Sequence, residues 1–135
     1  MKSILLVEDS RFLRVATERE LVRAGYNVMS AGDGEEALRM AYAKTPDLVL
    51  LDMLLPKIGG PEVLRALRNN PVTALVPVIV LSSLPQKNEA KLLKEGATAY
   101  FEKSKLELGH NVSSLLQIVK RMLHCTVEDQ VSSPS

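Results

Sequence analysis

The chain has 135 residues, which is enough for one compact domain and leaves little room for a second. Hydrophobic residues make up 46% of it, so a globular protein with an apolar core is favoured over a disordered one. Lysine and arginine number 17 and aspartate and glutamate 16, a balance that provides no chain-wide attraction to nucleic acid or to an acidic membrane surface.

The cysteine content and the N-terminal segment bear on where the protein works. The single cysteine, Cys125, cannot form an intramolecular disulfide, which is compatible with a reducing compartment. The first apolar run, at residues 4–7, is too short for the core of a signal peptide. No segment approaches the roughly 20 apolar residues of a membrane-spanning helix. We therefore expect a cytoplasmic protein that makes no contact with a membrane.

The chain begins with an alternation of short apolar runs and helical segments. Residues 4–7 and 27–31 have the length and character of β-strands. The segment between them has apolar residues at the spacing of a helix, and Gly25 is suited to ending that helix. The residues expected to share one face of it are Leu13, Ala16, Leu21 and Ala24.

The middle of the chain continues this alternation. A helix is expected at 34–43 with Asp33 as its N-cap, followed by an apolar run at 48–51. The next helix is expected to begin at Pro61, because the missing N–H of proline costs little at the first helical position. The inward-facing residues predicted for these two helices are Ala37, Leu38, Ala41, Val63, Leu64 and Leu67.

The last third predicts two strands and two helices. Apolar runs lie at 78–81 and 98–101, with a helix at 87–95 between them that Gly96 would end. A final helix is expected at 112–123 with Asn111 as its cap. Its apolar stripe is Leu115, Leu116, Val119 and Leu123.

Regular alternation of strands and helices predicts an α/β fold with one doubly wound domain. Three of the apolar runs are almost wholly apolar, which is typical of strands buried on both faces of a parallel sheet. We expect this domain to span 1–124. The polar segment 125–135 ends in Ser-Ser-Pro-Ser and is expected to be a flexible tail.

Polar side chains follow four of the predicted strands. Glu8 and Asp9 follow the first strand, Asp52 the third, Ser82 the fourth and Lys103 the fifth. In an open α/β sheet, ligand sites form beyond the carboxyl ends of the strands, near the point where strand order reverses. If the fold is right, these side chains therefore lie along one edge of the sheet.

Each of these residues also has an ordinary structural interpretation. Asp9 could cap the first helix, Asp52 could begin the turn that leads to Pro56, and Ser82 and Lys103 could be solvated loop residues. Together they favour phosphoryl chemistry. Clustered carboxylates need a hard cation such as Mg²⁺, an aspartate can attack a phosphoryl donor, and a lysine can balance the charge of the phosphoryl group.

Several motifs resemble the CheY-like receiver domain of two-component response regulators. They are ILLVEDS, DLVLLDMLLP, the glycine pair at 59–60, VIVLSS and GATAYFEK, and the resemblance runs from about residue 2 to residue 123. It implies a flavodoxin-like (βα)5 fold with strand order 2-1-3-4-5. It also implies a signalling switch, not an enzyme with an external substrate, that accepts a phosphoryl group from a sensor histidine kinase or a histidine phosphotransfer protein.

The resemblance assigns roles at the acidic site. Asp52 would be the phosphoacceptor, and Asp9 and Asp52 would ligate Mg²⁺ directly. Glu8 would act through a metal-bound water, and Leu54 would contribute its backbone carbonyl.

The resemblance also assigns the residues that sense the phosphoryl group. Ser82 would be the switch hydroxyl, Lys103 the phosphate-binding lysine, and Tyr100 the aromatic residue that changes rotamer on activation. The alternative for Tyr100 is a half-buried strand tyrosine without such a role. The family usually has proline after the lysine, often in a cis bond, whereas this chain has Ser104. Because a cis bond before a non-proline residue costs about 2.5–4 kcal/mol, we expect a trans Lys103–Ser104 bond.

The implied partner downstream is a protein that binds the surface formed by the fourth helix, the fifth strand and the last helix. A phosphorylation-dependent homodimer is compatible with the same surface, and no direct contact with nucleic acid is expected.

Three other functions remain as alternatives. The first is a receiver-like adaptor that is not phosphorylated. The second is a haloacid-dehalogenase-like phosphatase, which would have an acid two residues after its aspartate, where this chain has Leu54. The third is a cofactor-binding flavodoxin-like module, which would need a loop rich in Ser, Thr or Gly after the first strand, where this chain has Glu8 and Asp9.

Overall fold

A computed structural model describes residues 1–82, 89–102 and 112–125 of the chain. Every described strand pairs in parallel with its neighbours, and the strand order is β2-β1-β3-β4-β5. The predicted fold class is therefore confirmed. The described elements are β1 (Ser3–Val7), α1 (Arg11–Arg23), β2 (Asn27–Ala31), α2 (Gly34–Ala43), β3 (Leu48–Asp52), α3 (Gly60–Asn69), β4 (Val78–Ser82), α4 (Glu89–Lys94), β5 (Ala99–Glu102), α6 (Val112–Lys120) and the π-helical turn η2 (Arg121–Cys125).

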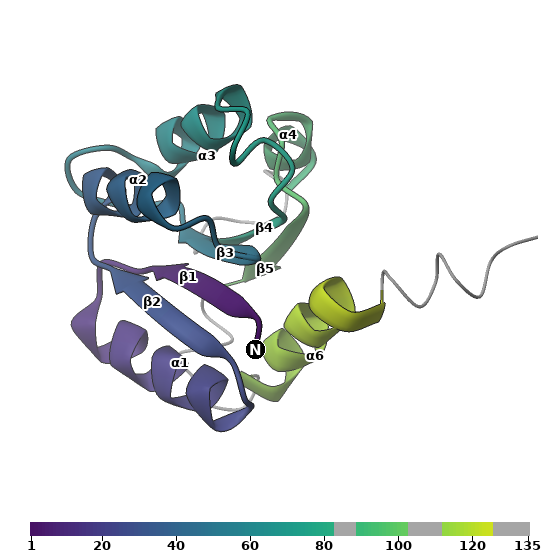
Figure 1. Ribbon diagram of the computed structural model, residues 1–135. Helices are drawn as coiled ribbons and strands as arrows, with labels where there is room; N and C mark the ends of the chain where they lie inside the picture. Colours follow the sequence, from purple (N-terminus) through teal and green to yellow (C-terminus); the bar gives the residue numbers. More distant parts are fainter. Residues whose placement is uncertain (83–88, 103–111, 126–135) are drawn as a thin grey trace, which may run out of the picture.

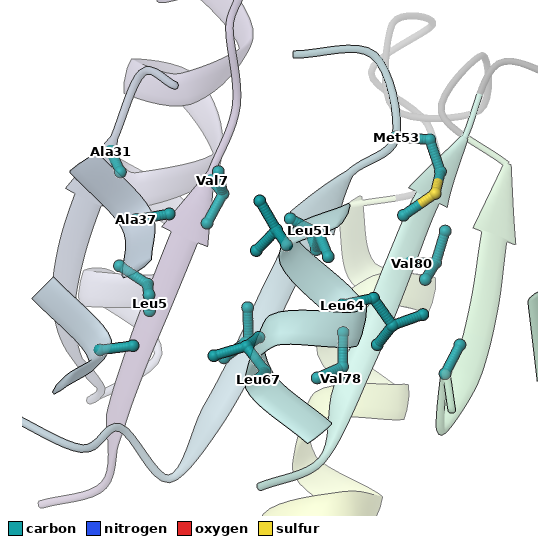
Figure 2. Close-up of a cluster of buried hydrophobic side chains, with 14 residues drawn as sticks. Leu5, Val7, Ala31, Ala37, Leu51, Met53, Leu64, Leu67, Val78 and Val80 are labelled. Atoms are coloured by element: carbon teal, nitrogen blue, oxygen red, sulfur yellow. The ribbon is translucent and has the colours of Figure 1, made fainter. Parts of the chain in front are cut away.

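Helices cover both faces of the sheet (Figure 1). The helices α2 and α3 pack on one face, and α1 and α6 pack on the other. Successive strand residues point to opposite faces, so β1 sends Leu5 and Val7 toward α2 and α3, and Ile4 and Leu6 toward α1 and α6. Figure 2 shows the cluster on the α2–α3 side. Every residue of β3 and β4 is buried, as their continuous apolar character predicted.

Several helix ends form as the sequence predicted. The Glu36 N–H donates to Oδ1 of Asp33 at 2.8 Å, which makes Asp33 the N-cap of α2. Gly25 and Gly96, with φ angles of 101° and 116°, follow α1 and α4 in the left-handed region that favours glycine. The expected cap Asn111 lies outside the described residues, as do residues 87 and 88 of the helix expected at 87–95.

The helix α1 differs from its prediction in two respects. Ala16 and Ala24 are exposed, and Thr17 joins Leu13 and Leu21 on the buried side. The reason is that residues 13, 17 and 21 are four apart and form one narrow stripe, which leaves the two alanines at its margins. The N-cap is Ser10, whose hydroxyl accepts the Leu13 N–H at 3.4 Å, so the interpretation of Asp9 as the cap is wrong.

The last described helix changes its winding at its C-terminal end. The chain is α-helical over Val112–Lys120 and then forms the π-helical turn η2. This turn brings the His124 ring onto the Tyr26 ring, with their centroids 5.9 Å apart and Nε2 of His124 3.2 Å from the Tyr26 hydroxyl. Burial raises the pKa of Tyr26. Across the described ranges, no helix combines the length and apolar character needed to cross a membrane.

Candidate functional site

The predicted acidic residues end neighbouring strands at one edge of the sheet. Val7 of β1 pairs with Leu51 of β3, and the residue after each is an acid, Glu8 and Asp52. Strand order reverses between these two strands, because β2 lies on one side of β1 and β3 on the other. The two carboxylates therefore lie at the topological switch point, where ligand sites form in open α/β sheets.

The acidic side chains at this edge differ in burial. Glu8 is 2% exposed and Asp52 1%, whereas Asp9 is exposed. A buried carboxylate is costly unless it is hydrogen-bonded. The Ser10 N–H donates to Oε2 of Glu8 at 2.8 Å, and the Leu54 N–H donates to Oδ1 of Asp52 at 3.1 Å. Main-chain donors of the loops that follow the strands thus orient both buried carboxylates.

The hydrogen bond from Leu54 also gives Asp52 a structural role. A carboxylate that accepts the N–H two residues ahead forms an Asx turn. Asp52 therefore begins the turn that leads to Pro56, as its structural interpretation predicted. This structural role does not compete with a chemical role, because one hydrogen bond to a carboxylate orients the group without neutralising it.

Ser82 and Asp52 end neighbouring strands at the same edge of the sheet, and by strand alternation Ser82 and Tyr100 leave their strands on one side and Asp52 on the other. Asp52 continues the β3 residues that pack toward α1 and α6, whereas Ser82 continues the β4 residues that pack toward α2 and α3. Tyr100 is half-buried and packs against the cluster on the α2–α3 side. Ser82 is 1% exposed. Two residues expected to act as one switch thus share a face.

The loop between β3 and α3 closes tightly behind Asp52. The Gly60 N–H donates to the Met53 carbonyl at 3.1 Å. A Cβ atom at Gly60 would lie 2.5 Å from the Met53 Cα and 2.6 Å from the Asp52 carbonyl oxygen. Within the loop, Lys57 has a positive φ of 68°, and its Nζ lies 3.7 Å from Oδ2 of Asp33. The end of β3 is therefore followed by a loop that needs glycine at 60.

Arg14 holds the loop that carries Glu8 and Asp9. Its Nη1 donates to the Glu8 carbonyl at 2.9 Å and to the Asp9 carbonyl at 3.5 Å. The sequence analysis did not identify this residue, because α1 contains three further arginines with nothing in their spacing to distinguish Arg14.

The acidic residues fit a hydrated divalent cation better than an all-protein metal cage. Within the described ranges, no group of three or more His, Cys, Asp or Glu side chains is placed to hold a metal ion. Mg²⁺ commonly takes only one or two carboxylates and keeps several waters. The buried pair Glu8 and Asp52, with the exposed Asp9 beside it, satisfies that smaller requirement. Leu54, the expected carbonyl ligand, is 60% exposed at the same edge.

Some predicted features lie outside the described residues. They are Lys103, the Lys103–Ser104 bond, and residues 126–135 of the expected tail. Cys125, where that tail was expected to begin, is the last residue of η2.

Comparisons with known proteins agree with this arrangement. Residues 4–112 match the family model of the response regulator receiver domain. A gliding motility regulatory protein of Myxococcus xanthus is 43% identical over 88% of this chain and 15% of its own length. The polar-differentiation response regulator DivK of Brucella anthropi is 34% identical over 76% of this chain and 84% of its own length.

A solved structure shows the same fold with a metal ion. The receiver domain of the sensor histidine kinase PA1611 of Pseudomonas aeruginosa has a TM-score of 0.79 and 28% identity, with 90% of this chain and 97% of that chain covered. That domain has a magnesium ion coordinated in its active-site cleft. The chain spans about half or less of the length of the first curated relatives that it matches.

Proposed function

We propose, given that this chain belongs to the response regulator receiver domain family, that it is a phosphorylation-dependent signalling switch with Asp52 as its phosphoacceptor. Receiver domains are signalling domains and not enzymes that turn over an external substrate. The observation that carries the proposal is the position of Asp52. It is a buried carboxylate at the end of the central strand β3, beside Glu8 at the topological switch point.

The chemistry is a phosphoryl transfer onto a carboxylate. An oxygen of Asp52 would form a bond to phosphorus while the bond from phosphorus to the donor's imidazole nitrogen breaks, and the donor would keep that electron pair. The hydrogen bond from the Leu54 N–H orients the attacking carboxylate. Lys103 would balance the charge on the phosphoryl oxygens.

Mg²⁺ is the cofactor of the proposal. When bound, it would neutralise negative charge on the carboxylates and on the phosphoryl oxygens. Asp9 and Asp52 would hold it directly, Glu8 through a water, and Leu54 through its backbone carbonyl. The support is the pair of buried carboxylates at neighbouring strand ends, together with the magnesium ion in the related receiver domain of PA1611.

The signal would be read at the carboxyl end of β4, which adjoins that of β3, and on β5. The Ser82 hydroxyl would donate to a phosphoryl oxygen, and Tyr100 would then change rotamer. The support is their position on neighbouring strands, because Ser82 ends β4 and Tyr100 pairs with Val80 of that strand. The proposed donors are a sensor histidine kinase or a phosphotransfer protein. The proposed target is a protein bound by α4, β5 and α6, or a second copy of this chain, in the cytoplasm.

The test is phosphorylation by a small donor. The purified protein is incubated with Mg²⁺ and acetyl phosphate, and its intact mass is followed beside that of two variants, Asp52→Asn and Asp47→Asn. Asp47 is an exposed acid before β3, at the opposite end of the strand from Asp52, so it controls for loss of a charge. We expect a gain of about 80 Da, one phosphoryl group, in the wild type and in Asp47→Asn but not in Asp52→Asn.

Two results would contradict the proposal. A wild type that gains no mass would favour the unphosphorylated adaptor. A gain that persists in Asp52→Asn would place the acceptor at another residue.

A further inference from the structure

One arginine connects the acidic loop to the first helix. Nη1 of Arg14, in the first turn of α1, donates to the main-chain carbonyls of Glu8 and Asp9 at 2.9 and 3.5 Å. These are two of the three acids assigned to the cation in the proposed function, the third being Asp52. The contacts are to main-chain oxygens, so they fix where the loop lies and leave the exposed Asp9 carboxylate in solvent.

Glu8 is held from three directions as a result. Its N–H donates to the Ala31 carbonyl of β2 at 3.0 Å, its carbonyl accepts from Arg14, and its carboxylate accepts the Ser10 N–H. Of these three contacts, the one from Arg14 is made by a side chain of α1. Arg14 therefore acts on the loop from α1, outside the expected ligand set.

Electrostatics explains why a cation is useful at this position. Glu8, Asp9 and Asp52 carry like charges at one edge of the sheet, and their repulsion favours a displaced acidic loop when no cation is bound. A guanidinium behind the loop opposes that displacement through charge-assisted hydrogen bonds. Its charge also repels a divalent cation. Arg14 therefore raises metal affinity by ordering the loop and lowers it by its own positive charge. The metal affinity of Arg14 variants measures which effect is larger.

The loop between β2 and α2 leaves room for this contact. A Cβ atom at Gly32 would lie 3.2 Å from Nη1 of Arg14. The Gly32 N–H donates to Oε1 of Glu36 at 3.0 Å, which fixes the glycine relative to α2. A methyl group at position 32 would press on the guanidinium without removing its charge.

We infer that Arg14 is a positioning residue for the divalent cation, acting through the main chain of Glu8 and Asp9. This inference rests on the proposed function, because it assumes that the acidic edge binds a cation. Ordering of the loop outweighs the repulsion between the guanidinium and the metal, so loss of Arg14 weakens metal binding.

The first test measures metal affinity directly. Mn²⁺ alone is the probe, and free Mn²⁺ is followed by electron paramagnetic resonance with the wild type, Arg14→Gln, Arg14→Lys and Arg19→Gln. We expect affinity to fall roughly 10-fold in Arg14→Gln, the range typical of residues that orient metal ligands. Arg14→Lys should recover part of the loss, because a single nitrogen makes both contacts.

Arg19 supplies the matched control. It is exposed on the same helix, so Arg19→Gln removes the same charge without touching the acidic loop. Its affinity for Mn²⁺ should equal that of the wild type or rise slightly. Gly32→Ala should weaken binding in the same direction as Arg14→Gln but by a smaller factor, with every charge still present.

The second test separates positioning from general stability. The rate of phosphorylation by acetyl phosphate is measured against Mg²⁺ concentration. In Arg14→Gln the half-saturating Mg²⁺ concentration should rise by the factor found for Mn²⁺, while the rate at saturating Mg²⁺ stays within about twofold of the wild type. A purely structural role would lower the maximal rate or the unfolding midpoint without that shift.

Several outcomes would overturn the inference. They are equal Mn²⁺ affinity in Arg14→Gln and the wild type, an equal loss in Arg19→Gln, and a wild type that binds no Mn²⁺. The proposed function fails separately, if the wild type binds Mn²⁺ but never gains a phosphoryl group. The effect of Arg14 on affinity would still be measurable in that case.

Discussion

Among single residues, Gly60 constrains the loop that follows Asp52. A Cβ atom there would lie so close to the Asp52–Met53 peptide that any side chain must displace the loop. We predict that Gly60→Ser lowers the free energy of unfolding by about 1–3 kcal/mol, the usual cost of forcing extra atoms into a packed site. Phosphorylation by acetyl phosphate should slow as well, because the displaced loop carries the Leu54 N–H. Urea unfolding and intact mass measure the two effects.

The neighbouring glycine provides the control. A Cβ atom at Gly59 would meet Oε2 of Glu62 at 2.7 Å, the far end of a flexible side chain that can move away. Gly59 is also the N-cap of α3 and supplies no side-chain hydrogen bond, whereas serine is a good cap. Gly59→Ser should therefore leave stability unchanged or raise it. Equal losses in the two variants would contradict the assigned role of Gly60.

Sequence reasoning identified the buried acids but not the residues that hold them. Glu8 and Asp52 were predictable because they directly follow apolar runs, and parallel strands bring their carboxyl ends to one edge. Arg14 was not predictable, because its partners are main-chain carbonyls that leave no pattern in the sequence. The glycine pair at 59 and 60 was noted as a motif, but only the structure shows which of the two is constrained.

Among the elements, α3 is fixed at its C-terminal end by a second arginine. Arg68 donates through Nε to the Gly96 carbonyl at 2.9 Å and through Nη1 to the carbonyls of Val76 and Ala74 at 2.7 and 3.1 Å. Burial lowers the pKa of Arg68. One side chain thus connects α3 to the loops that enter β4 and β5.

We predict that Arg68→Met lowers the free energy of unfolding by about 2–3 kcal/mol, because it leaves several carbonyls without their charged donor. Arg65→Met is the control on the same helix. The ion pairs of Arg65 with Glu62 and Glu95 are 3.8 and 3.9 Å long and largely solvent-exposed, so its loss should cost less than about 1 kcal/mol. Urea denaturation compares the two. Similar losses would show that Arg68 acts only as another surface charge.

The elements themselves were largely predictable from the sequence where a strand is buried on both faces of the sheet. The strands β3 and β4 are buried throughout, so a continuous apolar run was sufficient to locate them. The exposure of Ala16 and Ala24 on α1 was harder to predict, because alanine is compatible with either the buried or the exposed side of a helix. The change to π-helical winding after Lys120 has no marker in the residue pattern. It is associated in the structure with the contact between His124 and Tyr26.

For the whole molecule, the acids proposed to bind the cation, Glu8, Asp9 and Asp52, serve the proposed function at a cost in stability. The formal charge of +1 conceals a cluster of acids, because Glu8 and Asp52 are buried at neighbouring strand ends with Asp9 next to them. Like charges at one site destabilise the folded state, and a bound cation relieves that repulsion. The acids proposed to hold Mg²⁺ should therefore make the metal-free protein less stable than its apolar core would allow.

This conflict gives a prediction that urea unfolding can test with and without Mg²⁺. For the wild type, Mg²⁺ at ten times its dissociation constant should raise the free energy of unfolding by about 1.4 kcal/mol, and a chelator should reverse the gain. Asp52→Asn should be more stable than the wild type without metal, by about 1 kcal/mol, and should gain little from Mg²⁺. Glu35→Gln, at an exposed acid in the first turn of α2, should gain as much stability from Mg²⁺ as the wild type does. The opposite result would be an Asp52→Asn variant that is less stable than the wild type in chelator and is still stabilised by Mg²⁺. That result would mean that Asp52 matters mainly for its turn, and that it neither repels the neighbouring acids nor binds the cation.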